Sequence, residues 1–367
     1  MTSCKGVAIA QPAERSNSKP SRVLVYRLGS IGDFVVALPC LHLIRSHFST
    51  AEIALLTNRP VESRAAPAAS ILEGTDLVDR YLIYPAGDYR MSTMRHVAAD
   101  IRSFDADVLV HLMERTAAWK VYRDYVFFRC CGLRDIVGLP FTSDLRNCRP
   151  IGETGIWEPE AQRLARCIAA LGSADHGCAA GWDLHLTDKE ILEADRVLAK
   201  ETVGIPTGVR LLGVSIGTKQ AVNDWGDQNW RTVLAGLDAS LRNFALVLIG
   251  GAEDRERSRQ LAEHWSGPVF NFCGRLPPRL SAALLRRVDA LLCHDSGPMH
   301  LASAVGTRCI AVFSNKDLPG KWFPLGNGHV IIRPTSRTGS IRDIEPSAVI
   351  AAARRALETI AEPAGSV

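Results

Sequence analysis

A carboxylate follows a glycine turn near the start of the chain. Asp33 ends the segment Arg27-Leu28-Gly29-Ser30-Ile31-Gly32-Asp33, which comes directly after a β-branched run over residues 23–26. The two glycines allow a sharp turn and the close approach of a ligand. At the mouth of the following helix, Asp33 could take a proton from a hydroxyl, a role that contributes about 10²–10⁴ in rate. The alternative is a helix cap, a position that aspartate favours for structural reasons.

A second polar cluster, from His294 to His300, follows an apolar run over residues 291–293. Ser296 and Gly297 can offer a hydroxyl and backbone amides to a diphosphate, and the helix dipole adds about 0.3–1 kcal/mol per favourable charge. Asp295 suits sugar hydroxyls better than phosphate. Ser296 as an N-cap and His300 as an ordinary helix histidine are the structural alternatives, but the clustering favours a ligand site.

Two further turns carry residues of the same kind. Lys219 follows Gly217-Thr218 and can neutralise a phosphate as a point charge, although a solvated loop lysine is the alternative. Gly250-Gly251 precedes Glu253 and Asp254, and an acidic residue after such a turn can bind a ribose hydroxyl. The start of a surface helix explains the second turn equally well.

The elements that must position these residues alternate between strands and helices. Strand-like runs are expected at residues 23–26, 51–57, 107–111 and 136–139, and again at 211–215, 245–249, 291–293 and 310–313. We therefore expect an α/β protein with two parallel sheets, whose ligands bind where the carboxyl ends of the strands converge. Residues 346–360 are expected to form a final helix.

The composition excludes several classes of protein. A length of 367 residues indicates two domains, and a net charge of only +4 argues against a nucleic-acid partner. The ten cysteines include no C-x-x-C pair, which favours reduced thiols in a cytosol over a zinc or disulfide framework. No apolar run is long enough to cross a bilayer, and residues 1–21 are expected to form a loose polar tail.

Aromatic and basic residues alternate between Arg115 and Arg134. Such a stretch could seat an anionic, lipid-linked acceptor at a membrane surface. An amphipathic helix that packs its aromatic rings in the core is the more common structure, and we favour it, with a contribution of Arg115 to acceptor binding left open.

Taken together in order and spacing, these motifs resemble the heptosyltransferase family of lipopolysaccharide assembly. The resemblance runs from Arg22 to Pro334 and includes the opening turn with Ala37-Leu38-Pro39, the segment 295–302, Asp224-Trp225-Gly226 and the late loop around Trp322. It implies a GT-B glycosyltransferase fold of two Rossmann-like domains facing across a cleft. The expected parts are a flexible tail (1–21), an acceptor domain (22–185), a donor domain (186–340) and a C-terminal helix crossing back to the first domain (341–367).

The resemblance also implies an inverting transfer from a donor of the ADP-heptose type to a glycan or lipid-linked acceptor. No metal or other cofactor is expected, and the location is cytoplasmic, with peripheral inner-membrane contact as an option. Asp33 takes the position of the catalytic base. The donor-binding residues implied are Thr218, Lys219, Gly250, Gly251, Glu253, Asp295, Ser296, Gly297, Met299 and His300. The acceptor-binding residues implied are Gly29, Ser30 and Arg115.

One position departs from the family pattern. Relatives carry a lysine just before the Asp/His-Trp pair, whereas this chain has Asn223. A phosphate-neutralising charge is missing there, and Lys219 is the candidate substitute. The departure keeps a non-catalytic nucleotide-sugar binding protein open as an alternative, beside a sugar-nucleotide epimerase. An NAD-dependent oxidoreductase is disfavoured because the third glycine of a dinucleotide fingerprint is absent.

Overall fold

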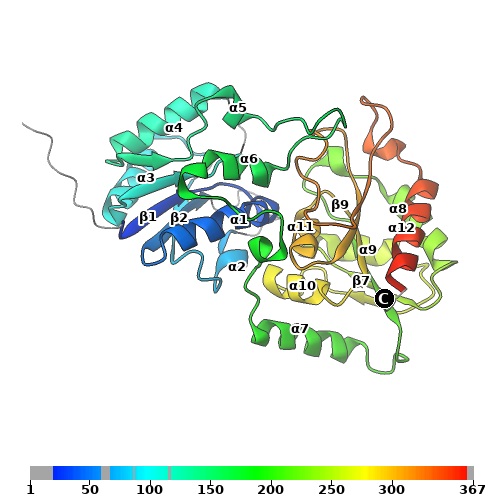
Figure 1. Cartoon of the computed structure of the whole chain (residues 1–367). Coiled ribbons are helices and arrows are strands. Elements are labelled where there is room, and N and C mark those ends of the chain that lie inside the picture. Colours follow the sequence, from blue (N-terminus) through cyan, green and yellow to red (C-terminus); the bar gives the residue numbers. More distant parts are fainter. Residues whose placement is uncertain (1–19, 59–66, 86, 115–116, 362–367) are drawn as a thin grey trace, which may run out of the picture.

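The chain folds into two lobes, each built around its own parallel sheet (Figure 1). The structure is a computed structural model that describes residues 20–58, 67–85, 87–114 and 117–361. Arg115 and nearly all of the expected tail at 1–21 lie outside these residues. The two sheets with helices on their faces confirm the predicted α/β fold of two Rossmann-like halves.

The first sheet contains five strands in the order β3-β2-β1-β4-β5, and all neighbouring strands are parallel. The strands are β1 (Arg22–Tyr26), β2 (Glu52–Asn58), β3 (Arg80–Tyr84), β4 (Val108–His111) and β5 (Asp135–Val137). Alternate residues of β1 enter different cores, as a strand period of two requires. Val23 and Val25 pack with α1 (Ile31–His47), whereas Leu24 and Tyr26 pack with α3 (Met91–Phe104).

The second sheet contains six strands in the order β11-β10-β9-β6-β7-β8, again parallel throughout. They are β6 (Arg210–Ser215), β7 (Phe244–Leu248), β8 (Val269–Asn271), β9 (Ala290–His294), β10 (Arg308–Val312) and β11 (Val330–Ile332). The helices of this lobe are α8 (Asp227–Asp238), α9 (Arg255–Leu261), α10 (Pro278–Leu285), α11 (Gly297–Ala304) and α12 (Pro346–Ala361).

The connection between the lobes is built from short helices and 3₁₀ turns that end in a longer helix. The short helices α2 (Ala69–Leu72), α5 (Ser143–Arg146) and α6 (Glu160–Cys167) belong to the first lobe, where α6 packs against α1. The chain then continues through short 3₁₀ turns to α7 (Asp188–Glu201), which packs on α10 of the second lobe. One apolar cluster includes residues of both α1 and α11, so the lobes share part of their core.

The prediction that the C-terminal helix crosses back to the first domain is wrong for α12. This helix packs against α8 and the strands β9, β10 and β11 of the second lobe (Figure 1). Val349 and Ala353 are fully buried there, and Arg308 donates a hydrogen bond of 2.7 Å to the carbonyl of Ala356. The apolar face of α12 is thus needed to cover its own sheet.

The aromatic stretch after β4 also differs from the expectation. It forms α4 (Ala118–Cys130), but the residues that face the core are Val121, Asp124 and Phe128. Trp119 and Tyr122 are 62% and 56% exposed. Only about one residue per helical turn is buried, so most of the aromatic rings project outward. The prediction that the aromatic rings pack in the core is wrong for these rings.

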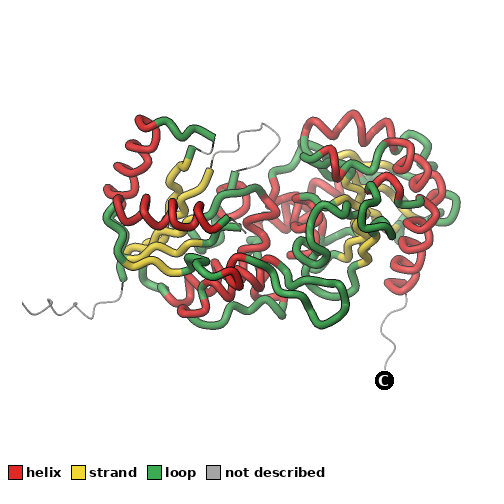
Figure 2. The backbone as a smooth tube through the Cα atoms, turned by 90° about the horizontal axis from the view of Figure 1, so that it is seen from above, coloured by secondary structure: helices red, strands yellow, loops and turns green. Residues whose placement is uncertain are grey.

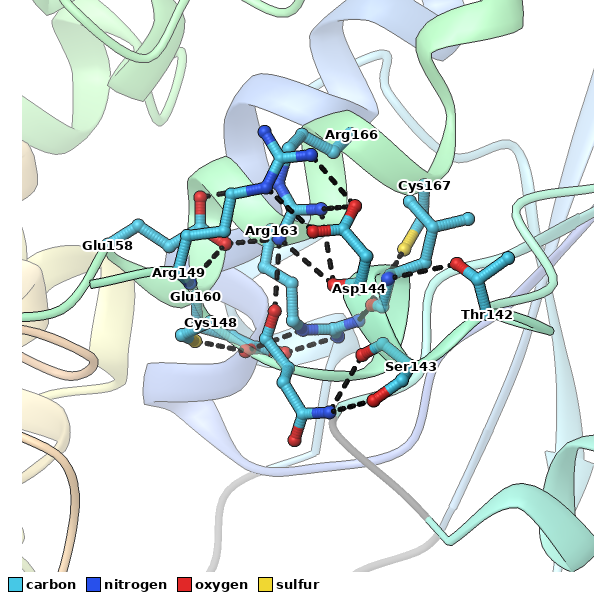
Figure 3. Close-up of polar contacts among 12 residues, drawn as sticks. Thr142, Ser143, Asp144, Cys148, Arg149, Glu158, Glu160, Arg163, Arg166 and Cys167 are labelled. Carbon is cyan, nitrogen blue, oxygen red and sulfur yellow. Dashed lines mark hydrogen bonds and ion pairs between the residues drawn. The ribbon is translucent and has the colours of Figure 1, made fainter. Parts of the chain in front are cut away.

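A buried ion pair fixes the connection from β5 to the second lobe. Arg163 and Glu160 on α6 have no exposed side-chain surface and are joined by bonds of 2.5 and 2.9 Å (Figure 3). Arg163 also donates to the carbonyls of Leu145 and Met113, each at 2.8 Å. Its guanidinium therefore ties α6 to the end of β4, where the cleft begins.

We expect Arg163→Met to lower the free energy of unfolding by about 3–5 kcal/mol, because it leaves Glu160 as a buried, uncompensated charge. The matched control is Arg149→Met, which removes an arginine of the same network that pairs with Asp144 at the surface (56% and 51% exposed side chains). That change should cost at most about 1 kcal/mol. Equilibrium denaturation in guanidinium chloride measures both, and equal losses would contradict the structural role of the buried pair.

Candidate functional site

The carboxyl ends of both sheets open into one cleft between the lobes, with a volume of about 680 Å³. The N-terminal ends of α1 and α11 face each other across it. A Cβ atom at Gly32 would lie 2.7 Å from the ring of His300, and one at Gly297 would lie 3.3 Å from Ile31. Side chains from the two lobes therefore meet over a distance that a single substrate can span.

Asp33 lies in the first turn of α1 and lines the cleft. Its Oδ2 accepts hydrogen bonds from the Ser30 amide at 2.7 Å and the Ser30 hydroxyl at 3.2 Å. Its Oδ1 lies 3.6 Å from the buried guanidinium of Arg27, and the side chain is 22% exposed. Asp33 therefore completes a capping box with the N-cap Ser30, a structural role of the kind that one interpretation of the sequence held, and is at the same time a carboxylate at the cleft wall.

Asp295, Ser296 and His300 line the opposite wall. Burial raises the pKa of Asp295 to about 7, with Asp317 adding to the rise and Lys316 opposing it. Burial lowers the pKa of His300 to about 4, so the ring is uncharged at neutral pH. His300 can thus offer a hydrogen bond to a ligand, but no charge.

Two strand-end turns complete the second lobe's side. Asp254 accepts a hydrogen bond of 2.9 Å from the Gly251 amide, and its carboxylate fills the space where side chains at Gly217 and Gly250 would lie. A side chain at either position would displace this carboxylate from the turn. Glu253 also lines the cleft, whereas the carboxylate of Asp254 is bonded within its own turn.

The structure brings most of the predicted site residues together. Those that line the cleft are Ser30, Asp33, Thr218, Lys219, Gly250, Gly251, Glu253, Asp295, Ser296, Gly297 and His300. Gly29 lies behind Asp33, and its amide donates to Asn58 at 2.7 Å. Met299 does not line the cleft: its side chain is fully buried in the core, which leaves only its backbone for the predicted donor contact.

Sequence reasoning missed several charged residues of the cleft. Glu114, Lys316 and Asp317 line it, and each follows the carboxyl end of a strand, β4 or β10. The rule that ligand-binding loops follow strand ends therefore pointed to them. They carry no glycine turn, which is the feature that singled out the other loops.

A short loop of the second lobe is bonded to the first lobe. Lys321, only 5% exposed, pairs with Glu114 at 2.6 Å. The Trp157 amide donates to the Pro319 carbonyl at 2.7 Å, and the Glu160 amide donates to the Lys321 carbonyl at 3.0 Å. These contacts close one side of the cleft.

In the described part of the chain, no group of three or more His, Cys, Asp or Glu residues is arranged to hold a metal ion. The nine cysteines among those residues are all free thiols. None of the helices there combines the length and the apolarity that a bilayer crossing requires.

Comparison with solved structures finds the same fold in several proteins. The chain is similar in structure to a glycosyl transferase family 9 protein from Veillonella parvula, with a TM-score of 0.69, 17% identity, and coverage of 92% of this chain and 98% of the other. It is also similar to the E. coli ADP-heptose lps heptosyltransferase II, with a TM-score of 0.62, 17% identity and coverage of 92% and 99%.

A third similar structure is the E. coli heptosyltransferase WaaC with ADP, with a TM-score of 0.61, 15% identity and coverage of 91% and 99%. WaaC has also been solved with ADP-2-deoxy-2-fluoro heptose, a structure that matches at a TM-score of 0.56. No curated protein matches the chain. The sequence model of glycosyltransferase family 9 (heptosyltransferase) matches residues 163–345, about half of the chain, and by this match the chain belongs to that family.

Proposed function

We propose that this family 9 glycosyltransferase moves a heptose from ADP-heptose to a hydroxyl of a lipopolysaccharide or related glycan, with inversion and without a metal. The observation that carries the proposal is the single cleft lined by Asp33 from one lobe and by Ser296 and Gly297 from the other. The ligands of the similar WaaC structures, ADP and a fluorinated ADP-heptose, support the choice of donor.

The acceptor half of the reaction needs a base. Because Oδ2 of Asp33 is held by Ser30, Oδ1, which lies 3.6 Å from the Arg27 guanidinium, is the oxygen left to accept from an acceptor hydroxyl. The hydroxyl proton passes to Oδ1, the acceptor oxygen bonds to the anomeric carbon, and the bond from that carbon to the diphosphate oxygen breaks. The electron pair of that bond leaves with the ADP.

The donor half must stabilise the charge that develops on the departing diphosphate. The first turn of α11 lacks intrahelical partners for its amides, and Pro298 has no amide, so Gly297 and Met299 are the amides suited to the phosphates. Through its amide, Met299 can contribute although its side chain is buried. The Ser296 hydroxyl and the uncharged His300 ring add neutral hydrogen-bonding groups.

We propose in addition that the outer face of α4 rests on an anionic bilayer that carries the acceptor. Trp119, Tyr122 and Val126 are exposed, and the exposed Phe141 packs on Tyr122 at a ring distance of 5.4 Å. The cationic groups of Lys120 and Arg123 lie 5.8 and 5.7 Å from the Trp119 ring. Aromatic rings beside cations suit the interface of an anionic membrane.

Asp33→Asn tests the base. The amide oxygen can still accept from Ser30, so the helix cap and donor binding should survive, while turnover falls by about 10²–10⁴. ADP release from ADP-heptose in the presence of core-oligosaccharide acceptors measures turnover, and calorimetry with ADP measures binding. Near-normal turnover would remove Asp33 from the base role. Donor binding by the unaltered protein without transfer to any acceptor would favour a non-catalytic binding protein.

Donor affinity should fall as pH rises from 6 to 8. The pKa of Asp295 is raised to about 7, so its repulsive negative charge appears within this range, whereas His300, with a pKa near 4, stays uncharged. One added charge near the diphosphate is worth about 1 kcal/mol, or about fivefold in affinity. Titrations of ADP-heptose by calorimetry measure the slope.

The control for this slope is Asp295→Asn, whose affinity should not change between pH 6 and 8. Asp33, Asp317, Lys316 and Lys321 also act on Asp295 and stay in place in the variant. An equal slope in both proteins would assign the pH dependence to another group.

The membrane contact predicts that Trp119→Ser with Tyr122→Ser weakens binding to phosphatidylglycerol vesicles by about fivefold or more, because it removes the inserted rings. Val203→Ser, which changes an 81% exposed apolar residue of the other lobe, should have no effect. Co-sedimentation measures both, and equal binding by all three proteins would overturn this part of the proposal.

A further inference from the structure

The position where the resemblance described above implies a lysine is neutral and closed in this chain. Asn223 is 6% exposed, and its side-chain oxygen accepts a hydrogen bond of 2.6 Å from the hydroxyl of Ser314, which is 8% exposed. Ser314 follows β10, whereas Asn223 follows β6. The amide thus joins the two strand-end loops that form the floor of the cleft.

The bond between Asn223 and Ser314 helps to position Lys316, which lies on the loop after β10. The hydroxyl of Ser314 also accepts a hydrogen bond of 3.4 Å from the Lys316 amide, so the bond to Asn223 and the start of the Lys316 turn share one atom. The Lys316 ammonium then donates to the side chain of Gln220, just before Asn223 in the chain. The charge therefore lies over the same loop that carries a lysine in the family pattern.

The ammonium of Lys316 forms no ion pair with a described residue. Within the described residues, no carboxylate lies within ion-pair distance of its ammonium, and its partner Gln220 is neutral. Lys321, by contrast, is neutralised by Glu114 at 2.6 Å. Lys316 and Asp295 line the same cleft, and the charge of Lys316 opposes the rise of the pKa of Asp295.

The cleft needs such a charge. Its lining contains six carboxylates, Asp33, Glu114, Glu253, Asp254, Asp295 and Asp317, against two lysines, Lys219 and Lys316. A nucleoside diphosphate adds further negative charge to this surface. Without a cation close to the phosphates, the local field opposes binding.

We infer that Lys316, on the loop after β10, supplies the cation for the donor's diphosphate in place of the lysine that Asn223 replaces. The inference rests on the proposed function only in taking the ligand to be a nucleoside diphosphate. Asn223 then has a positioning role, because its bond to Ser314 holds the turn from which Lys316 extends. The sequence alone favoured Lys219 for this task, and the two lysines make different predictions.

Calorimetry with ADP, GDP, UDP and adenosine tests the inference on the full chain. We expect Lys316→Met to weaken binding of the preferred nucleoside diphosphate by about 10- to 100-fold, the usual range for a charge-assisted hydrogen bond. Lys316→Arg should retain most of the affinity. Binding of adenosine, which has no phosphate, should not change.

Two comparison variants sharpen the result. Lys219→Met should cost less than Lys316→Met, and Lys200→Met, which changes an exposed lysine on α7, should cost nothing. Adding Asn223→Lys to Lys316→Met should restore part of the lost affinity, because it returns a cation to the neighbouring loop. A larger loss in Lys219→Met, or unchanged affinity in Lys316→Met, would overturn the inference and leave the proposed function standing. If the unaltered protein binds none of the nucleoside diphosphates, both are wrong.

Discussion

The close contact between the N-termini of helices α1 and α11 determines where the two lobes meet. Gly32 at the start of α1 faces His300 on α11, and a Cβ there would lie only 2.7 Å from the histidine ring. Each helix follows a central strand of its sheet, so the contact brings the carboxyl ends of both sheets to one place. The position of the cleft between the two sheets follows from the close approach of these two turns.

Buried guanidinium groups hold the first lobe's side of that contact. Arg27 has no exposed surface and donates to the carbonyls of Leu112 at 2.7 Å and Asp33 at 2.9 Å. Arg163 does the same for Met113 and Leu145. Carbonyls at strand and helix ends would otherwise be unsatisfied inside the protein. The two buried arginines thus hold these segments of the first lobe together beside the cleft.

The central strands and the strand-end turns could be predicted from the sequence, since buried parallel strands form continuous apolar runs and glycine marks the turns. The edge strands β3, β8 and β11 were not among the expected strands. Each is short or half-exposed, so its apolar signal is weak. For α4, composition alone does not reveal which side of a helix faces the core, and the inward stripe there includes the charged Asp124.

The site residues divide in the same way. Asp33, Ser296 and Glu253 could be found because they stand next to glycine turns, and their place in the cleft follows from the fold. Lys316 has no such neighbour, and its importance depends on a bond between Asn223 and Ser314, which are far apart in sequence. Long-range side-chain contacts of that kind leave no local pattern.

The loop around Gly320 has a consequence for any attempt to divide the protein. Although it comes late in the chain, it is fastened to Trp157, Glu160 and Glu114, and Gly320 sits so close to the Trp157 carbonyl that a side chain there would overlap it at 2.2 Å. A single cut between the sheets would strip a buried ammonium and two carbonyls of their partners. The halves visible in Figure 1 are therefore not separable modules. A fragment that begins after the linker would expose polar groups that are bonded to the first lobe in the whole chain. Figure 2, seen from above, shows helices and loops lying between the two sheets.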